Sequence, residues 1–171
     1  GLVGEGRMAE PHEIIAFLVQ YITAALPLIG KKALVTAGPT YEAIDPVRFI
    51  GNHSSGKMVF AIAECLAALG AGVTLITGPT AEKNGTILKR IDVISAADML
   101  KACLDNFKES TITVMSAAVA DYTPVEVATQ KIKKKETAFN ISLKKTTDIL
   151  ATLGELKGKH QIIVGFALET E

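Results

Sequence analysis

Residues 36–58 read TAGPTYEAIDPVRFIGNHSSGKM, and this stretch sets the organisation of the 171-residue chain. The apolar run before it, residues 33–37, predicts a strand, and its Ser-Ser-Gly-Lys end predicts the start of a helix. α/β proteins build anion sites where a strand leads through a polar loop to a helix N-terminus, because unpaired N–H groups and the helix dipole favour negative charge there. The stretch contains neither the G-x-G-x-x-G dinucleotide fingerprint nor the P-loop G-x-x-x-x-G-K-S/T. It therefore predicts a site for a phosphorylated ligand, with these candidate residues: Gly38, Ser54, Ser55, Gly56 and Lys57.

The same segment has a simpler interpretation, in which Ser54 or Ser55 is only the N-cap of the helix. The helix is predicted over residues 55–69 and is expected to stop at Gly70. Its predicted apolar face consists of Met58, Ile62, Leu66 and Leu69.

The composition is that of a globular protein, with 49% hydrophobic and 21% charged residues. Its 18 basic and 18 acidic residues cancel, so the charge favours neither nucleic acid nor an anionic membrane as a partner. Cys65 and Cys103 lie in apolar helical patterns without neighbouring metal ligands, which is typical of reduced core residues in a cytoplasmic protein. The apolar segment 14–29 is shorter than the roughly 20 residues of a membrane span and contains polar residues.

Residues 1–28 are expected to be a unit separate from the rest. Pro11 suits the first turn of a helix, and Pro27 and Gly30 suit its end. One apolar stripe is predicted along this helix, consisting of Ile14, Ile15, Leu18, Val19 and Ile22.

Strands and helices alternate from residue 32 onward. Strands are predicted at residues 33–37, 73–77, 88–94, 111–115 and 162–166, with a shorter one at 139–143. Further helices are predicted at 95–108, with Ser95 as N-cap, and at 147–153, while 121–135 is predicted as a charged loop. This pattern predicts a doubly wound, mainly parallel, Rossmann-like α/β sheet with helices on both faces and ligands at the carboxyl ends of its strands. Since the sequence stops directly after a core strand, we expect the domain to be incomplete at its C-terminus.

Four further places could carry chemistry. Asn52 precedes the helix start, and Asp121 follows the strand-end run 115–120, where such a sheet binds ligands, although a lone Asp is as often a turn or cap residue. Lys131 begins a lysine-rich run, which in most proteins is a solvated loop. Phe166 ends the last strand and could stack on a base or pack in the core.

Three segments together resemble the phosphopantothenoylcysteine synthetase family: residues 36–58, then SAAVADYTPVEVATQKIKKK (116–135), then IIVGFALETE (162–171). The resemblance covers residues 31–171, which we interpret as the synthetase domain. The opening GEGRMAEP resembles the end of the flavin-dependent decarboxylase to which bacterial synthetases are fused. The resemblance thus implies that residues 1–28 are a decarboxylase remnant with a linker helix, and that FMN belongs to the decarboxylase half and is not bound by this chain.

The resemblance implies a two-step ligase of coenzyme A biosynthesis. The carboxylate of 4′-phosphopantothenate attacks the α-phosphate of CTP, giving an acyl-cytidylate and pyrophosphate, and the amine of cysteine then displaces CMP. A lysine beside the α-phosphate would stabilise the charge that develops in the first step, and the family places Lys131 there. The second step requires the intermediate to be held and polarised, and the family gives that role to Asn52.

The nucleotide contacts that the resemblance implies are Ser116, Ala117, Asp121, Lys131, Lys145, Thr146 and Phe166. The triphosphate implies Mg²⁺, held mainly by phosphates and water, since no protein ligand is evident. The family forms homodimers, and residues 45–53 are a candidate dimer contact.

The sequence departs from the family pattern at several positions. Gly51 replaces a serine, Val59 a glycine, and Thr146-Thr147 an Asn-Pro pair. The family also continues past residue 171 with further nucleotide-binding lysines, so weak CTP binding and slow turnover are expected of this chain. Three alternatives stay open: an NAD(P)-binding oxidoreductase, which the missing glycine fingerprint disfavours, an inactive binding domain, and an ATP-dependent ligase.

Overall fold

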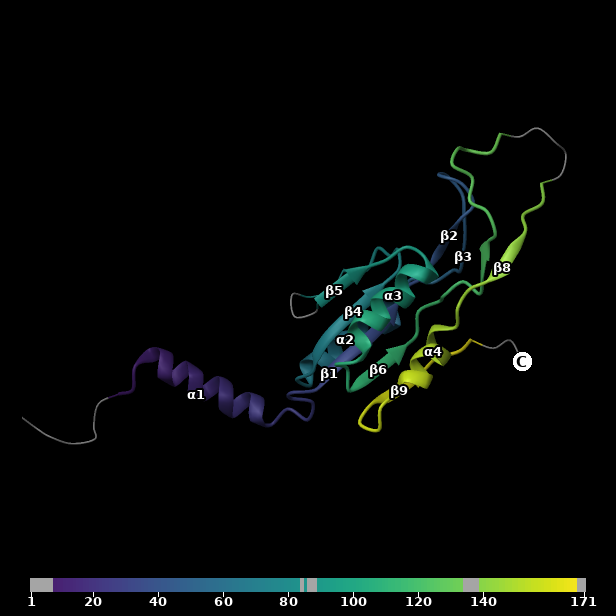
Figure 1. Cartoon of the computed structure of the whole chain (residues 1–171). Helices are drawn as coiled ribbons and strands as arrows, with labels where there is room; N and C mark the ends of the chain where they lie inside the picture. Colours follow the sequence, from purple (N-terminus) through teal and green to yellow (C-terminus); the bar gives the residue numbers. More distant parts are fainter. Residues whose placement is uncertain (1–7, 84, 86–88, 134–138, 169–171) are drawn as a thin grey trace, which may run out of the picture.

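The computed structural model describes residues 8–83, 85, 89–133 and 139–168 (Figure 1). Its central sheet consists of β1 (Lys32–Ala37), β4 (Gly72–Thr77), β5 (Lys89–Asp92), β6 (Ile112–Met115) and β9 (Ile162–Gly165). All neighbouring strands are parallel, and the order is β5-β4-β1-β6-β9. The strand order reverses between β1 and β6, which is where a doubly wound sheet opens a crevice at its carboxyl edge. The predicted parallel, Rossmann-like sheet is confirmed.

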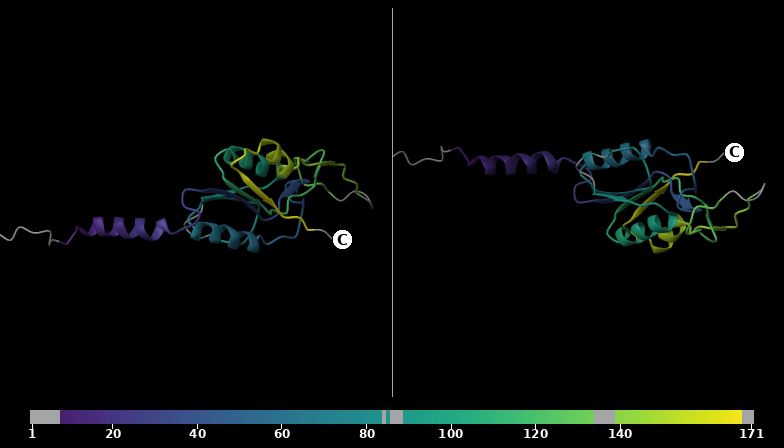
Figure 2. Two further views of the ribbon diagram at one scale, coloured as in Figure 1. Left: turned by 90° about the horizontal axis from the view of Figure 1, so that it is seen from below. Right: turned by 90° about the horizontal axis from the view of Figure 1, so that it is seen from above.

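Helices cover both faces of this sheet (Figure 2). Helix α2 (Lys57–Ala68) packs on one face, and α3 (Ala96–Phe107) with α4 (Ile149–Leu156) packs on the other. Successive residues of β1 therefore enter two different cores: Val35 belongs to the α2 side and Leu34 to the α3 side. A strand buried on both faces needs a continuous apolar run, which is the pattern that the sequence showed.

Helix α2 differs in two respects from its prediction. Its N-cap is Gly56, with φ at 76°, rather than Ser54 or Ser55. The fully buried residues are Val59, Phe60 and Ala63. Of the predicted face, Ile62 and Leu66 pack partly buried against the core, whereas Met58 is 55% and Leu69 37% exposed. The helix is apolar over much of its circumference, so periodicity alone did not decide which face meets the sheet, and the small Ala63 permits a close approach. The predicted stop at Gly70 is confirmed, since this residue has φ at 99° directly after the C-cap.

The two cysteines also differ from each other. Cys103 is fully buried in α3, and burial raises the pKa of its thiol to about 12. Cys65 is exposed on α2, so its predicted place in the core is wrong. Both are free thiols.

Two hairpins replace the predicted loops at the carboxyl side of the sheet. Strands β2 (Tyr41–Ala43) and β3 (Phe49–Gly51) pair antiparallel, as do β7 (Tyr122–Pro124) and β8 (Leu143–Lys145). The loop predicted over 121–135 is found for residues 125–133, but it begins with the unpredicted strand β7, and residues 134–135 lie outside the described part. The strand predicted at 139–143 is displaced, since β8 begins at Leu143, because three-residue strands are too short to show a period. β2 contacts β7, and we call residues 41–51, 122–133 and 139–145 the hairpin lobe (Figure 1).

Helix α1 (Pro11–Ala24) projects away from the sheet (Figures 1 and 2). Pro11 starts it as predicted, and the Glu10 and Glu13 side chains form a capping box. None of its residues is buried, and the predicted stripe of Ile15, Leu18 and Ile22 is exposed. Within the described ranges, no helix has the length and apolar character needed to cross a membrane.

Candidate functional site

A cavity of about 820 Å³ lies at the carboxyl edge of the sheet, beyond the ends of β1, β6 and β9. Its walls come from three separate segments: the residues after β6, the β8–α4 connection and the end of β9. Five predicted nucleotide-binding residues line it together: Ala117, Asp121, Lys145, Thr146 and Phe166. These residues span 50 positions of sequence and meet because parallel strands end at a common edge.

The loop after β6 is held by a threonine of the neighbouring strand β1, Thr36, and by Thr40, which follows that strand. The buried hydroxyl of Thr36 accepts hydrogen bonds from the amides of Ser116 (3.3 Å) and Ala117 (3.4 Å). The amide of Ala120 donates to the hydroxyl of Thr40 at 2.9 Å. These contacts fix the backbone of the loop that leads to Asp121. The exposed Asp121 side chain is therefore held on a backbone with little freedom.

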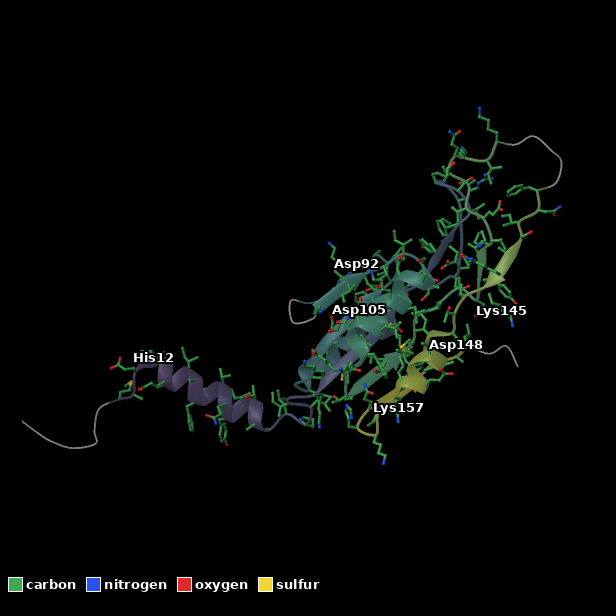
Figure 3. The ribbon with its side chains drawn as sticks, in the orientation of Figure 1. His12, Asp92, Asp105, Lys145, Asp148 and Lys157 are labelled. Carbon is green, nitrogen blue, oxygen red and sulfur yellow. The ribbon has the colours of Figure 1, made fainter. Side chains whose placement is uncertain are left out.

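The connection between β8 and α4 crosses next to this loop. Thr146 donates from its hydroxyl to the Ala120 carbonyl (2.7 Å) and from its amide to the Asp121 carbonyl (2.9 Å). Lys145 precedes it with an exposed side chain, and Asp148 follows as the N-cap of α4, accepting from the Ala151 amide (Figure 3). A cation and the start of a helix therefore lie on the same wall, a combination that suits phosphate.

Phe166 contributes to the apolar part of the cavity lining. Its amide donates to the Met115 carbonyl at 2.9 Å, which extends the pairing of β9 with β6 by one residue. Its ring is 51% exposed, and Ile149 and Leu150 line the cavity with it. A half-exposed ring beside a cation and a carboxylate has the character of a nucleotide site, where the base stacks and the polar groups bind ribose and phosphate.

Asn52 lies directly after β3, outside the cavity lining but connected to it. Its side-chain amide donates to the carbonyls of Ala118 (3.3 Å) and Val119 (3.1 Å), and Val119 lines the cavity. The base of the β2–β3 hairpin is thereby joined to the loop after β6.

The candidate phosphate-binding residues, Gly38 and residues 54–57, also lie at the carboxyl edge of the sheet, where two glycines are in close contact. Gly38 and Gly56 both have positive φ, and a Cβ on Gly56 would lie 3.2 Å from the Gly38 nitrogen. The Ser55 carbonyl accepts from the Thr80 hydroxyl at 2.6 Å, and the Lys57 side chain is exposed at the start of α2. The structure thus places Ser54, Ser55, Gly56 and Lys57 in one turn, which packs against Gly38 beside the end of β1.

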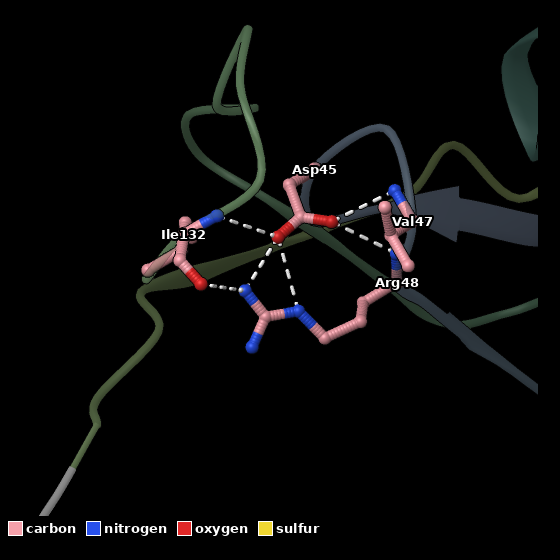
Figure 4. Close-up of polar contacts among 4 residues, drawn as sticks. All are labelled: Asp45, Val47, Arg48 and Ile132. Atoms are coloured by element: carbon pink, nitrogen blue, oxygen red, sulfur yellow. Dashed lines mark hydrogen bonds and ion pairs between the residues drawn. The ribbon is translucent and has the colours of Figure 1, made fainter. Parts of the chain in front are cut away.

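Lys131 and Ser116 are the two nucleotide candidates that the structure keeps out of the cavity lining. Lys131 is exposed on the hairpin lobe, next to Ile132, whose backbone is bound by Asp45 and Arg48 (Figure 4). Ser116 is turned toward β1 through its amide.

Sequence reasoning missed the residues that position this site. Thr36, Thr40, Glu42 and Asp45 are all buried, and their partners lie 54 to 87 residues away. Glu42 accepts from the Ala96 amide at 2.8 Å and so connects β2 to α3. In the sequence, these residues are visible only as polar positions within apolar or turn segments. That pattern does not predict which distant residue each of them contacts.

Among the described residues, no group of three or more His, Cys, Asp and Glu side chains could hold a metal ion. Asp121 and Asp148 are the carboxylates that line the cavity, and one oxygen of Asp148 is already engaged as a cap. The donor set therefore fits a metal that arrives with the phosphates of a ligand and takes few oxygens from the protein.

The model of one protein family, the DNA/pantothenate metabolism flavoprotein C-terminal domain, matches residues 28–171. The chain belongs to this family. A relative named coenzyme A biosynthesis bifunctional protein CoaBC, from Haemophilus influenzae, is 49% identical over all of this chain and 43% of its own length. Another relative, named cysteine/cysteine sulfinic acid decarboxylase and from an unknown prokaryotic organism, is 47% identical over all of this chain and 49% of its own length.

A solved structure supports the same assignment. The crystal structure of the C-terminal domain of a CoaBC protein matches with a TM-score of 0.74 and 46% identity, covering 85% of this chain and 68% of that one. The resemblance inferred from the three sequence segments is thereby confirmed. The chain spans less than half the length of the curated relatives that it matches.

Proposed function

We propose that this chain ligates 4′-phosphopantothenate to cysteine with CTP, through an acyl-cytidylate, in coenzyme A biosynthesis. The observation that carries the proposal is the cavity at the carboxyl edge, where Asp121, Lys145 and Phe166 come together from three segments. The family membership and the 49% identity to a bifunctional coenzyme A biosynthesis protein support it.

Each cavity residue has a role that its chemistry suits. The half-exposed ring of Phe166 stacks on the cytosine, and Lys145 pairs with the phosphates beside the start of α4. Asp121 accepts a hydrogen bond from a ribose hydroxyl or contributes one oxygen to Mg²⁺. Ala117 and Thr146 shape the cavity through their backbones, which Thr36 and Ala120 hold in place.

The two steps use residues on the hairpins. Lys131 stabilises the charge that develops on the α-phosphate, which requires the hairpin lobe that carries it to approach the bound nucleotide, and the side chain is exposed for this contact. Asn52 holds the acyl-cytidylate while the amine of cysteine attacks the acyl carbon and CMP leaves. Mg²⁺ bound to the triphosphate supplies charge neutralisation for this chemistry. The turn at residues 54–57, together with Gly38 against which it packs, binds the phosphate of 4′-phosphopantothenate.

The remaining proposals concern residues 1–28, the cellular location and the oligomeric state. Residues 1–28 belong to a decarboxylase unit and its linker, which is supported by a helix α1 without buried residues, and FMN is bound by that unit alone. The protein is cytoplasmic and forms a homodimer. The homodimer is supported by exposed apolar side chains on the hairpin lobe, among them Val47, Phe49, Val125 and Val127.

Mass spectrometry tests the central proposal. The purified protein is incubated with 4′-phosphopantothenate, CTP and Mg²⁺ without cysteine, and an acyl-cytidylate is expected to accumulate. Adding cysteine should convert it to phosphopantothenoylcysteine and CMP. If an acyl-adenylate forms with ATP and no acyl-cytidylate forms with CTP, the nucleotide substrate is ATP rather than CTP. The absence of any intermediate with either nucleotide would contradict the proposal.

A further inference from the structure

The tip of the β2–β3 hairpin contains an unusually well-bound carboxylate. Asp45 is 2% exposed, and both of its oxygens accept hydrogen bonds (Figure 4). Oδ1 accepts from the amides of Val47 (2.8 Å) and Arg48 (2.9 Å). Oδ2 accepts from the Arg48 side chain, through Nε at 3.0 Å and Nη2 at 2.5 Å, and from the Ile132 amide at 3.1 Å.

Ile132 is held by the hairpin through both of its backbone groups. Besides its amide bond to Asp45, its carbonyl accepts from Arg48 Nη2 at 3.0 Å. The Arg48 guanidinium also lies 5.8 Å from the centre of the Phe139 ring, on the returning arm of the same loop. The backbone beside Lys131 is therefore fixed to a hairpin that is 87 residues away in sequence.

The other end of the hairpin carries Asn52, which is bound to the loop after β6. Asn52 lies four positions after Arg48, which at about 3.3 Å per residue corresponds to roughly 13 Å of strand. One short, paired element thus joins the Lys131 segment to the cavity edge.

We propose that Asp45 is a positioning residue for Lys131, holding the Lys131 segment on the tip of the hairpin whose base carries Asn52. This inference rests on the proposed two-step ligase function. Its consequence is that Asp45 serves the first step, through Lys131, and leaves the second step, at Asn52, largely unaffected.

The electrostatics fit this role. The Arg48 side chain, followed by the amides of Val47, Ile132 and Arg48, holds the pKa of Asp45 well below its usual range despite burial. The carboxylate therefore stays ionised at neutral pH. A contact between charged and well-aligned groups is a stronger anchor than neutral hydrogen bonds of the same number.

The substitution Asp45→Asn separates this role from simple turn formation. An asparagine has one oxygen and one NH₂ group, whereas donors face both oxygens of Asp45, so either amide orientation opposes a donor with a donor. Asp98→Asn is the matched control. The Asp98 carboxylate also accepts hydrogen bonds, from Ser95, and its pKa is likewise lowered, but it caps α3.

The two half-reactions are measured separately in single-turnover experiments. With CTP and 4′-phosphopantothenate, Asp45→Asn should form acyl-cytidylate at least 10-fold more slowly than wild type, and Asp98→Asn within 2-fold of it. With preformed acyl-cytidylate and cysteine, Asp45→Asn should react within 3-fold of wild type. Equal losses in both half-reactions would show that the change merely damages the hairpin, and an unchanged first step would also overturn the proposal.

Amide hydrogen exchange tests the contact between Asp45 and Ile132 independently of activity. Hydrogen exchange of the Ile132 amide, followed by NMR, should accelerate at least 10-fold in Asp45→Asn and stay unchanged in Asp98→Asn. If wild type forms no intermediate with CTP or ATP, the ligase proposal fails, and the exchange rate still reports whether the anchor exists. Unchanged exchange at Ile132 would contradict the anchor itself.

Discussion

The carboxyl edge of the sheet and the hairpin lobe are stabilised in different ways. Strand β1 is buried on both faces and paired on both sides, so the loops that follow it and β6 are fixed by a continuous core. The lobe exposes several of its large apolar side chains. The buried carboxylate of Asp45 joins two of its segments, and that of Glu42 connects it to α3. In the proposed enzyme, the first region binds the nucleotide and the second delivers the reacting groups.

The largest effect is expected for Lys131, where a substitution should slow the reaction without weakening nucleotide binding. Because Lys131 is outside the cavity lining, Lys131→Gln should leave CTP affinity within a few-fold while slowing acyl-cytidylate formation on the order of 10³-fold. Calorimetric titration and rapid-quench rates measure the two quantities. A parallel loss of affinity and rate would mean that Lys131 belongs to the binding region.

The next prediction concerns packing at the sheet edge. A Cβ on Gly78 would lie 1.6 Å from the Pro39 carbonyl oxygen, so Gly78→Ala should lower the free energy of unfolding by about 3 kcal/mol. Gly154→Ala is the control, since its Cβ meets no atom within 4 Å inside α4 and should add roughly 0.5–1 kcal/mol. Urea denaturation of both variants checks the pair, and similar stabilities would contradict the packing.

Asn52 lies where the two regions join. In Asn52→Asp, a carboxylate would face the Ala118 and Val119 carbonyls in place of a donating amide. The second step should slow about 100-fold, so acyl-cytidylate should accumulate and persist after cysteine is added. Mass spectrometry over time measures this persistence, and rapid conversion to product would exclude Asn52 from the second step.

The smallest predicted effect is on stability in acid. The pKa of Asp45 lies below its ordinary value of 3.8, so the unfolded chain binds more protons between the two values. The stabilisation by Asp45 is therefore complete above about pH 4 and is lost progressively as the pH falls further. Asp45→Asn should show a flatter fall in unfolding free energy below pH 4 than wild type, and parallel curves would contradict the shift.

The sequence predicted the two regions unequally for physical reasons. Residues 33–37 and 73–77 were correctly predicted as buried strands, because short, mainly apolar runs of this kind are typical of strands buried on both faces of a sheet. The right-handed connection between parallel strands then restricts the strand order. The β2–β3 hairpin was missed because its strands are short and its stability depends on Asp45, whose partner Ile132 is distant in sequence.

The site was predictable chiefly through the resemblance. Asp121 and Phe166 end strands, but no spacing rule predicts that they share a cavity with Lys145. The hydroxyl of Thr36 illustrates the limit most clearly, since its role depends on amides 80 and 81 residues away.

The most direct test of the account is a map of amide NMR shifts during titration with CTP and Mg²⁺. The shifts should concentrate at residues of the carboxyl-edge cavity, such as Ala117, Asp121, Thr146 and Phe166. The pocket at the opposite edge, beside Lys32, Gly72 and Glu109, should not respond. Shifts centred on that opposite edge, or no shifts at millimolar CTP, would contradict the central claim.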